Sequence, residues 1–161
     1  MSILSNLDII KICKDLKIKN FIGVFSKDLL PKIQKNGFYI INLENSKDKN
    51  GFPLPGSHYV ALYLFNKDAL YCDSYGIIMP IEVEKFCKNR NLYYNTTEFQ
   101  DYDSECCGWF ALMFCDFMNS HKNGSIDKRF NHFINHFVKN KYMHNNIICQ
   151  KYFEKRFKKL N

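Results

Sequence analysis

Long apolar runs are missing from this sequence, and none approaches the roughly 20 residues that a helix needs to cross a bilayer. The first residues, Met1 to Asp8, contain no basic region followed by an apolar stretch, so we expect no signal peptide. Internal repeats and domain linkers are missing too. These absences predict a soluble, intracellular domain over 1–161, neither secreted nor membrane-bound. It is long enough to bury a core, and we expect a monomer.

Paired Cys-x-x-Cys motifs, which commonly hold structural zinc, are also missing. The seven cysteines are an odd number without the spacing of a disulfide framework, so we expect reduced thiols, one of them reactive. His132 and His136 have the spacing of a helical metal pair, but no acid lies between them and no third ligand is evident. We therefore predict no metal site and no cofactor that the residues themselves require.

Acidic residues are scarce at the C-terminal end. Residues 128–161 hold nine Lys or Arg against one acid, Glu154, whereas the rest of the chain holds fourteen against fifteen. The basic helical portion 125–161 could therefore bind a polyanion such as DNA. The candidate contacts are Lys151, Lys155, Lys158 and Lys159. The alternative is a Lys-rich helix that only faces solvent.

The apolar patterns alternate between helical and strand periods along the chain. The expected helices lie at about 6–16, 80–89, 107–120, 126–140 and 145–159, and the expected strands at about 21–25, 38–43, 58–65, 69–73 and 92–100. The helix from 107 to 120 is apolar nearly all round, so we expect it to be central and buried. This order predicts an α+β fold with a mixed central β-sheet flanked by helices.

A polar loop ends in a cysteine that begins this apolar helix. A thiol at a helix N-terminus lies at the positive end of the helix dipole, which favours the nucleophilic thiolate. We prefer Cys107 to Cys106 as the nucleophile because Gly108 follows it and leaves room for a substrate backbone. The Cys107 N–H could also join an oxyanion hole. The alternative is that both cysteines are buried apolar residues, which is common for free Cys.

Three upstream residues complete a candidate thiol hydrolase site. His58 follows a Gly- and Pro-bearing loop at 44–56 and begins a strand, and it could deprotonate the thiol. Asp73 ends the returning strand of the same hairpin, so it could orient the His58 ring and stabilise the imidazolium. Gln100, seven residues before Cys107, could donate to the oxyanion. Taken alone, Asp73 is also typical of a turn, and Gln100 of a solvent-facing strand end.

The order and spacing of these residues resemble the adenain-type cysteine proteases, the adenovirus maturation protease and its relatives in other DNA viruses and virophages. The matching segments are Gly56-Ser57-His58-Tyr59-Val60-Ala61, Asp73-Ser74-Tyr75-Gly76, Gln100 with Cys107-Gly108-Trp109-Phe110, and Gly23-Val24-Phe25-Ser26-Lys27. The resemblance covers about residues 16–119. The seven-residue spacing from Gln100 to Cys107 favours this family over the related SUMO-type proteases, which usually have six.

The resemblance implies a papain-like architecture with the circularly permuted order His58, Asp73, Gln100, Cys107, the last two forming the oxyanion hole. It further implies a thiol endopeptidase that processes viral capsid or core precursors after small residues such as Gly. Such an enzyme acts in the host cytoplasm or viral factory and is packaged in the virion. An activating viral peptide and DNA are the cofactors that it could use.

Three residues depart from the family pattern. Asp73 stands where adenovirus enzymes have Glu, and either carboxylate can orient an imidazole. Tyr59 replaces the usual Trp, which weakens an aromatic contact with the imidazolium. Cys87, the nearest candidate for a disulfide with an activating peptide, falls on an expected helix and out of register, so the sequence gives little support for that mode of activation.

Two other functions fit parts of the sequence. The same chemistry could serve a ubiquitin- or SUMO-like deconjugating protease. Alternatively, a chain with inert thiols could be a non-enzymatic basic module that binds nucleic acid or capsid.

Overall fold

The computed structural model describes residues 1–160 and has an α+β fold built around a mixed five-stranded sheet. The strands are β1 (Phe21–Ser26), β2 (Gly37–Asn42), β3 (Tyr59–Phe65), β4 (Asp68–Cys72) and β5 (Asn91–Tyr94). The helices are α1 (Asn6–Asp15), α2 (Ile81–Phe86), α3 (Cys107–Ser120), α4 (Ile126–Ile134) and α5 (Tyr142–Lys158), with one 3₁₀ turn, η1 (Lys27–Leu29). The coarse fold class predicted from the sequence is therefore confirmed.

The strands lie in the sheet in the same order as in the chain. The three central strands, β2 to β4, pair antiparallel, and the outer pairs β1–β2 and β4–β5 are parallel. A two-residue turn joins β3 to β4, and its first residue, Asn66, has a positive φ of 52°. Short hairpin turns favour this backbone conformation because its twist matches that of the flanking strands.

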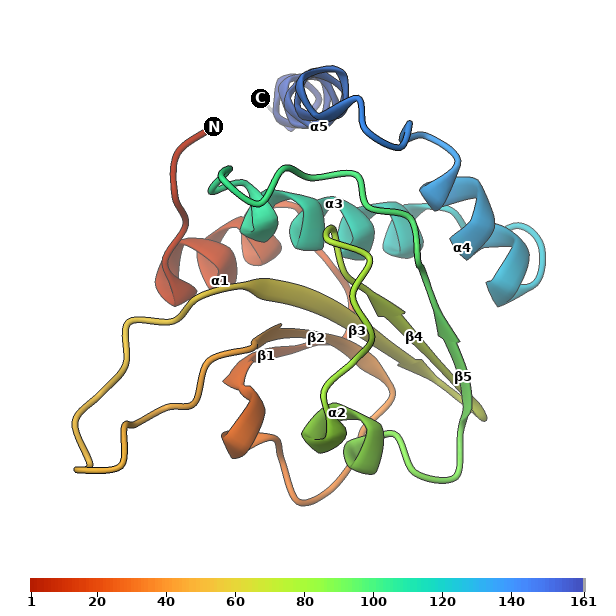
Figure 1. Cartoon of the computed structure of the whole chain (residues 1–161). Helices are drawn as coiled ribbons and strands as arrows, with labels where there is room; N and C mark the ends of the chain where they lie inside the picture. The colour runs from red at the N-terminus through yellow and green to blue at the C-terminus, as the bar shows by residue number, and fades with distance from the viewer. Residues whose placement is uncertain (161) are drawn as a thin grey trace.

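Successive strand residues alternate between two apolar cores, because side chains of a strand point to opposite faces. Phe38 and Ile40 of β2 pack with the helices α1 and α3, whereas Tyr39 and Ile41 pack in the second core with Val83 of α2. Figure 1 shows α1 and α3 on one side of the sheet and α2 with η1 on the other. The sheet is thus covered on both faces.

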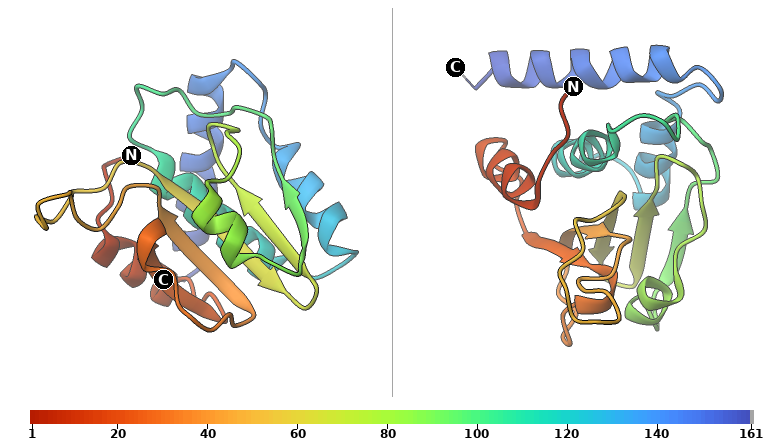
Figure 2. Two further views of the ribbon diagram at one scale, coloured as in Figure 1. Left: turned by 60° about the horizontal axis from the view of Figure 1, so that its bottom comes forward. Right: turned by 60° about the vertical axis from the view of Figure 1, so that its left-hand side comes forward.

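Helix α3 lies at the centre of the larger core. Eleven of its fourteen residues are buried, as its nearly uniform apolar character predicted. On the side away from the sheet, α5 crosses over it, as both views in Figure 2 indicate. Asp116 of α3 is fully buried and anchors this crossing, because it accepts bonds from the Arg156 guanidinium (2.6 and 2.8 Å) and from the Tyr152 hydroxyl (2.6 Å).

Three elements are shorter than the sequence indicated. One is α2, which ends at Phe86 because residues 87–89 form a turn. Strand β5 ends at Tyr94 because the buried Asn95 side chain bonds the backbone of Asp73 in both directions (2.9 and 2.6 Å), which turns the chain away from the sheet. Helix α4 ends at Ile134, where Phe137 N–H bonds back to the Ile134 carbonyl at 3.0 Å in a tightened turn.

Within residues 1–160, no helix combines the length and the apolar character that crossing a membrane requires.

Candidate active site

The hairpin β3–β4 brings two of the predicted site residues together. His58 immediately precedes β3 and Asp73 immediately follows β4, so the antiparallel pairing leaves both at the same end of the sheet. Their side chains bond at 2.7 Å between His58 Nε2 and Asp73 Oδ1, and both residues are buried, with exposures of 8% and 0%. Asp73 Oδ1 also accepts a bond from the Tyr75 N–H at 2.9 Å. The Tyr75 N–H therefore holds the Asp73 carboxylate in the position from which it orients the His58 ring.

This bond determines which ring nitrogen is available for chemistry. Because the carboxylate accepts from Nε2, that nitrogen carries the proton, and Nδ1 is the basic nitrogen of the neutral ring. Nδ1 is buried and has no hydrogen-bond partner of ordinary geometry among the described residues. A buried, unpartnered nitrogen is costly in a protein interior unless it serves another purpose.

Cys107 is the first residue of α3, and its thiol interacts with this imidazole. Burial raises the pKa of a thiol, but the hydrogen-bonding and charge interaction with His58 and the N–H groups of Tyr59 and Gly108 outweigh burial, so the pKa of Cys107 is lowered. The Cys107 N–H, at the first position of the helix, has no acceptor in a preceding turn. The Cys107 thiol, with its lowered pKa, and the free Cys107 N–H therefore both lie at the N-terminus of α3.

The pKa of His58 moves in the opposite direction. Burial alone would lower it, but the bond to Asp73 and the interaction with Cys107 raise the pKa of His58 to about 9. A raised imidazole pKa and a lowered thiol pKa favour transfer of the proton from sulfur to nitrogen. Both shifts therefore favour a thiolate–imidazolium pair, with the imidazolium bonded to the Asp73 carboxylate.

The remaining six cysteines differ from Cys107. All are buried, and burial raises the pKa of each of them: Cys13, Cys72, Cys87, Cys106, Cys115 and Cys149. Cys106, the neighbour that the sequence offered as an alternative nucleophile, is the N-cap of α3. Cys87 is 1% exposed, which leaves its sulfur inaccessible to a thiol from another chain.

Gln100 lies on the irregular segment after β5, not on a strand, and is fully buried. Its Oε1 accepts from Ser74 Oγ at 2.6 Å, and its Nε2 donates to the Ser104 carbonyl at 2.8 Å. The amide is therefore held between the residue after the candidate acid and the loop that leads to Cys107. Since an amide nitrogen has two hydrogens, one N–H remains for another acceptor.

Tyr75 is a site residue whose role the sequence reasoning missed. Its ring stacks on the His58 imidazole with centroids 4.0 Å apart and planes 13° apart. Tyr102 packs against the other side of Tyr75 at 4.6 Å. An electron-rich aromatic face favours a cationic ring and limits the access of water to it. The only signal in the sequence is an aromatic residue two positions after Asp73.

The N-terminal segment packs beside Gly108. A Cβ at this position would lie 3.4 Å from Leu4 and 3.5 Å from the Tyr59 ring, which are ordinary van der Waals contacts. The N-terminal segment is further held by a 2.8 Å bond from Trp109 Nε1 to the Ser2 carbonyl. The room expected for a substrate backbone beside the Cys107 thiol stays a prediction.

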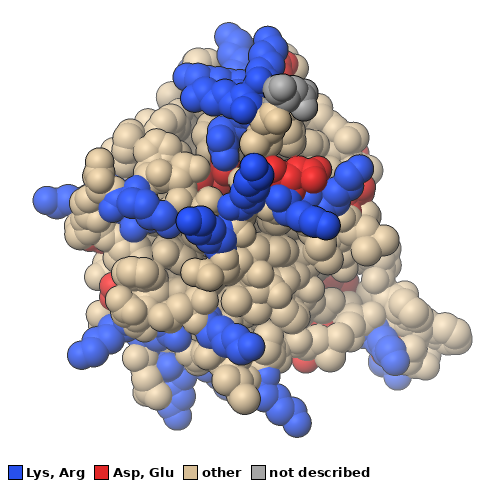
Figure 3. Space-filling model, turned by 180° about the vertical axis from the view of Figure 1, so that it is seen from behind, with Lys and Arg blue, Asp and Glu red and all other residues tan. Residues whose placement is uncertain are grey.

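The four basic residues expected to contact DNA all lie on α5 or at its C-cap, and all are exposed: Lys151, Lys155, Lys158 and Lys159. Figure 3 shows Lys and Arg side chains gathered at the top of the molecule, where α5 lies. Among the described residues, none of these lysines forms a hydrogen bond or ion pair with His58, Asp73 or Cys107, so the basic residues and the candidate site are separate groups.

Across residues 1–160, no three His, Cys, Asp or Glu side chains converge in a way that could hold a metal ion. Cys107, His58, Asp73 and Gln100 include the kinds of group that nucleophilic acyl transfer requires: a thiol with a lowered pKa, an imidazole oriented by a carboxylate, and an amide N–H. No protein-family model matches this chain, and no curated protein matches it.

Proposed function

We propose that this chain is a cysteine endopeptidase that resembles the adenain-type proteases and cleaves viral capsid or core precursors after small residues such as Gly. The observation that carries the proposal is the buried His58–Asp73 pair, whose free ring nitrogen serves the one thiol of seven with a lowered pKa. A purely structural ion pair would not require a reactive thiol beside it. The chain order from His58 through Asp73 and Gln100 to Cys107 also supports the permuted, papain-like arrangement.

In the acylation half of the reaction, the Cys107 thiolate attacks the scissile carbonyl carbon, and the carbonyl π electrons move to oxygen. The free N–H groups of Gln100 and Cys107 stabilise this oxyanion. When the tetrahedral intermediate collapses, the C–N bond breaks and the His58 imidazolium gives its proton to the leaving amine. The products are the amine and a thioester on Cys107.

In the deacylation half, neutral His58 removes a proton from water as the water attacks the thioester. Collapse of the second intermediate breaks the C–S bond, releases the carboxylic acid and restores the thiolate–imidazolium pair. Asp73 stabilises the imidazolium in both halves through its 2.7 Å bond to Nε2. The stacked Tyr75 ring keeps the imidazole in one orientation throughout.

A cavity of about 520 Å³ is the proposed path for an extended peptide substrate. Residues 3–8, Pro55 and Tyr59 line it, whereas His58, Asp73, Gln100 and Cys107 do not. Its link to the site is Tyr59, which directly follows His58 and whose N–H interacts with the Cys107 thiol.

The decisive experiment is cleavage of a proteome-derived peptide library, read by mass spectrometry of the new termini. The wild-type protein is expected to cut after small residues, and Cys107→Ala is expected to abolish both cleavage and iodoacetamide labelling of the reactive thiol. Cys106→Ala is the matched control and should retain most activity. Loss of cleavage in Cys106→Ala, with retention in Cys107→Ala, would refute the assignment of the nucleophile.

The same preparation separates the alternatives. Rapid adduct formation between Cys107 and a ubiquitin or SUMO vinyl sulfone would favour deconjugation over precursor processing. Absence of any cleavage, with DNA binding that falls steeply with salt and survives Cys107→Ala, would favour a non-enzymatic nucleic-acid module.

DNA as a cofactor is a separate part of the proposal. The exposed lysines of α5 supply positive charge on the helix that covers α3. Charge reversal of Lys151, Lys155, Lys158 and Lys159 is expected to lower DNA affinity and to flatten its salt dependence. Unchanged binding would exclude this surface.

A further inference from the structure

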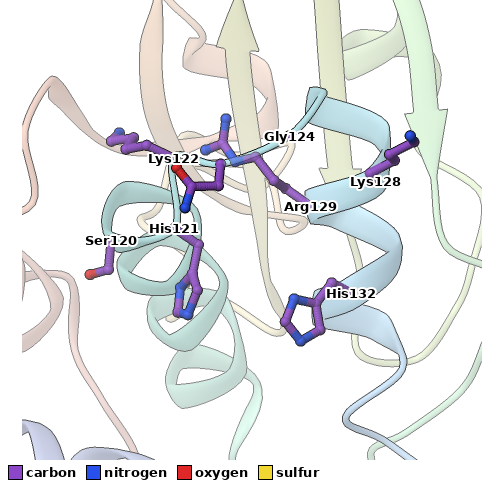
Figure 4. A pocket seen from close by; sticks show the side chains of 8 residues that line it. Ser120, His121, Lys122, Gly124, Lys128, Arg129 and His132 are labelled. Atoms are coloured by element: carbon purple, nitrogen blue, oxygen red, sulfur yellow. The ribbon is translucent and has the colours of Figure 1, made fainter.

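A second, basic pocket lies at the end of α3 opposite Cys107, where the chain turns into α4. Its volume is about 530 Å³, and its polar lining comes from Ser120, His121, Lys122, Lys128, Arg129 and His132. Figure 4 shows these side chains around the end of α3, the connecting loop and the first turns of α4, with the His121 and His132 rings near each other and Lys122 and Lys128 extending to opposite sides of Arg129. Asn123 and Gly124 complete the lining, which thus includes no carboxylate. We call this set of residues the anion pocket.

Arg129 is the buried charge of the anion pocket. Its exposure is 8%, and its Nη2 donates to the Met118 carbonyl at 2.6 Å near the end of α3. Its Nε is buried and has no hydrogen-bond partner in the described part of the chain, and no carboxylate lies within ion-pair distance. An enclosed guanidinium without a counter-charge is costly. None of the ion pairs among residues 1–160 involves Arg129, so none offsets the cost of burying its charge.

The cations around Arg129 increase the cost. Partial burial, together with the positive charges of Arg129 and Lys19, lowers the pKa of Lys122, which indicates mutual repulsion. Lys128 adds a further positive charge to the lining. The acid of α4, Asp127, is half-buried, lies outside the lining of the pocket, and has its pKa lowered by an interaction with Ser125. A bound anion would relieve this repulsion.

Histidine rings make up the other wall. His121 stacks on Phe117 with centroids 3.9 Å apart, and its Nδ1 bonds the Phe117 carbonyl at 3.0 Å. A carbonyl only accepts, so Nδ1 carries a proton and Nε2 is the nitrogen left for a ligand. The His132 ring centroid lies 6.2 Å from that of His121, and His132 stacks on His136 at 5.1 Å. The two lining rings are therefore held in place before any ligand binds.

We propose that the anion pocket binds a phosphate group, with Arg129, Lys122, Lys128 and His121 as its contacts. One held guanidinium and two exposed lysines without an acid match the charge of a phosphate better than that of a single carboxylate, and guanidinium groups suit phosphate oxygens. The phosphate can be free or belong to a nucleic-acid backbone. The inference is independent of the proposed protease activity, because the pocket contains none of the residues of that site.

Histidine-resolved NMR tests the proposal in the intact protein. Inorganic phosphate is added at constant ionic strength, against chloride, while the ring signals of all five histidines are followed. The signals of His121 and His132 are expected to move and saturate, whereas that of His144, outside the pocket, stays in place. No saturable movement at His121 and His132, or equal movement with chloride, would overturn the proposal.

Charge-neutralising variants make the test specific. Lys122→Met and Lys128→Met change exposed residues and should leave the melting temperature unchanged. Each is expected to weaken phosphate binding about tenfold, which corresponds to about 1.4 kcal/mol. Lys151→Met, an equal charge change elsewhere, is the matched control. Equal weakening in all three variants would show general charge attraction and overturn a specific pocket.

Competition identifies the source of the phosphate. A single-stranded oligonucleotide without terminal phosphates is added to the phosphate-saturated protein. If the oligonucleotide displaces phosphate, the His121 and His132 signals move from their phosphate-bound positions to new ones. Such a movement, blocked by Lys122→Met, would support binding of a nucleic-acid backbone. Unchanged signals would support free phosphate or a phosphomonoester as the ligand.

Discussion

Replacement of Gln100 by alanine tests the oxyanion hole most directly. The side chain is fully buried, uses its oxygen for Ser74 and one N–H for Ser104, and leaves its second N–H free. Removal of one oxyanion donor typically costs about 2.7–4 kcal/mol in the transition state, which lowers kcat by about 10² to 10³. We expect this loss in kcat with little change in KM, because the donor acts mainly when charge develops on the oxygen.

The same substitution also has a structural cost that must be measured separately. Gln100→Ala breaks one buried and one part-buried hydrogen bond, each contributing about 1 kcal/mol to the free energy of unfolding. Ser74→Ala is the matched control, since it removes one of these bonds but keeps the free N–H. We expect Ser74→Ala to retain kcat within about tenfold, because it lowers the free energy of unfolding without removing an oxyanion donor.

Two assays on the same proteins separate the interpretations. Peptide cleavage passes through an oxyanion, whereas alkylation of Cys107 by iodoacetamide at a saturated carbon does not. Gln100→Ala should therefore lose cleavage and keep the alkylation rate. Cleavage within tenfold of wild type would refute the oxyanion role of Gln100. A parallel loss of alkylation would instead show that Gln100 acts by positioning the thiol.

Three further outcomes follow from the structure. The rate of peptide cleavage should rise with pH below the ordinary thiol value of 9.0, as Cys107 ionises at its lowered pKa, and fall above about pH 9 as His58 loses its proton; a single rise centred on 9.0 would contradict the ion pair. Tyr75→Ala should lower kcat/KM about fivefold by removing a stacking partner worth about 1 kcal/mol, whereas Tyr75→Phe keeps the ring, and equal losses in both would assign the effect to the hydroxyl. Asp116→Ala should lower the free energy of unfolding by about 3 kcal/mol in urea titrations, because it leaves a charged partner without its acceptor, whereas the exposed Asp15→Ala changes it by less than about 0.5 kcal/mol.

Local patterns were enough to predict the central part of the fold. The alternation of residues 58–73 and the short turn within them indicate an antiparallel hairpin, and such a hairpin must place its two outer ends together. The contact between His58 and Asp73 therefore follows from residues close in sequence. The start of α3 at Cys107 was equally readable, because a polar loop changes there to a continuous apolar run.

Contacts between distant segments could not be predicted in this way. The sequence does not reveal that Tyr75 stacks on His58, or that the Asn95 side chain ends β5 and leaves Gln100 on an irregular segment. A buried acid such as Asp116 looks the same in sequence as an exposed one, since its partner lies forty residues away. Leu4 gives no sign that it packs against the nucleophile's neighbour. Each of these features depends on tertiary packing, which periodicity does not encode.

The short chain separation within the base–acid pair has a consequence for biosynthesis. Fifteen residues separate His58 from Asp73, so a single hairpin can assemble them early, whereas the sulfur arrives only when α3 settles between the sheet and α5. Until that docking, Cys107 is an ordinary thiol with no imidazole to ionise it. In the proposed protease, a chain whose α3 has not docked lacks an ionised Cys107, so cleavage requires the completed interior.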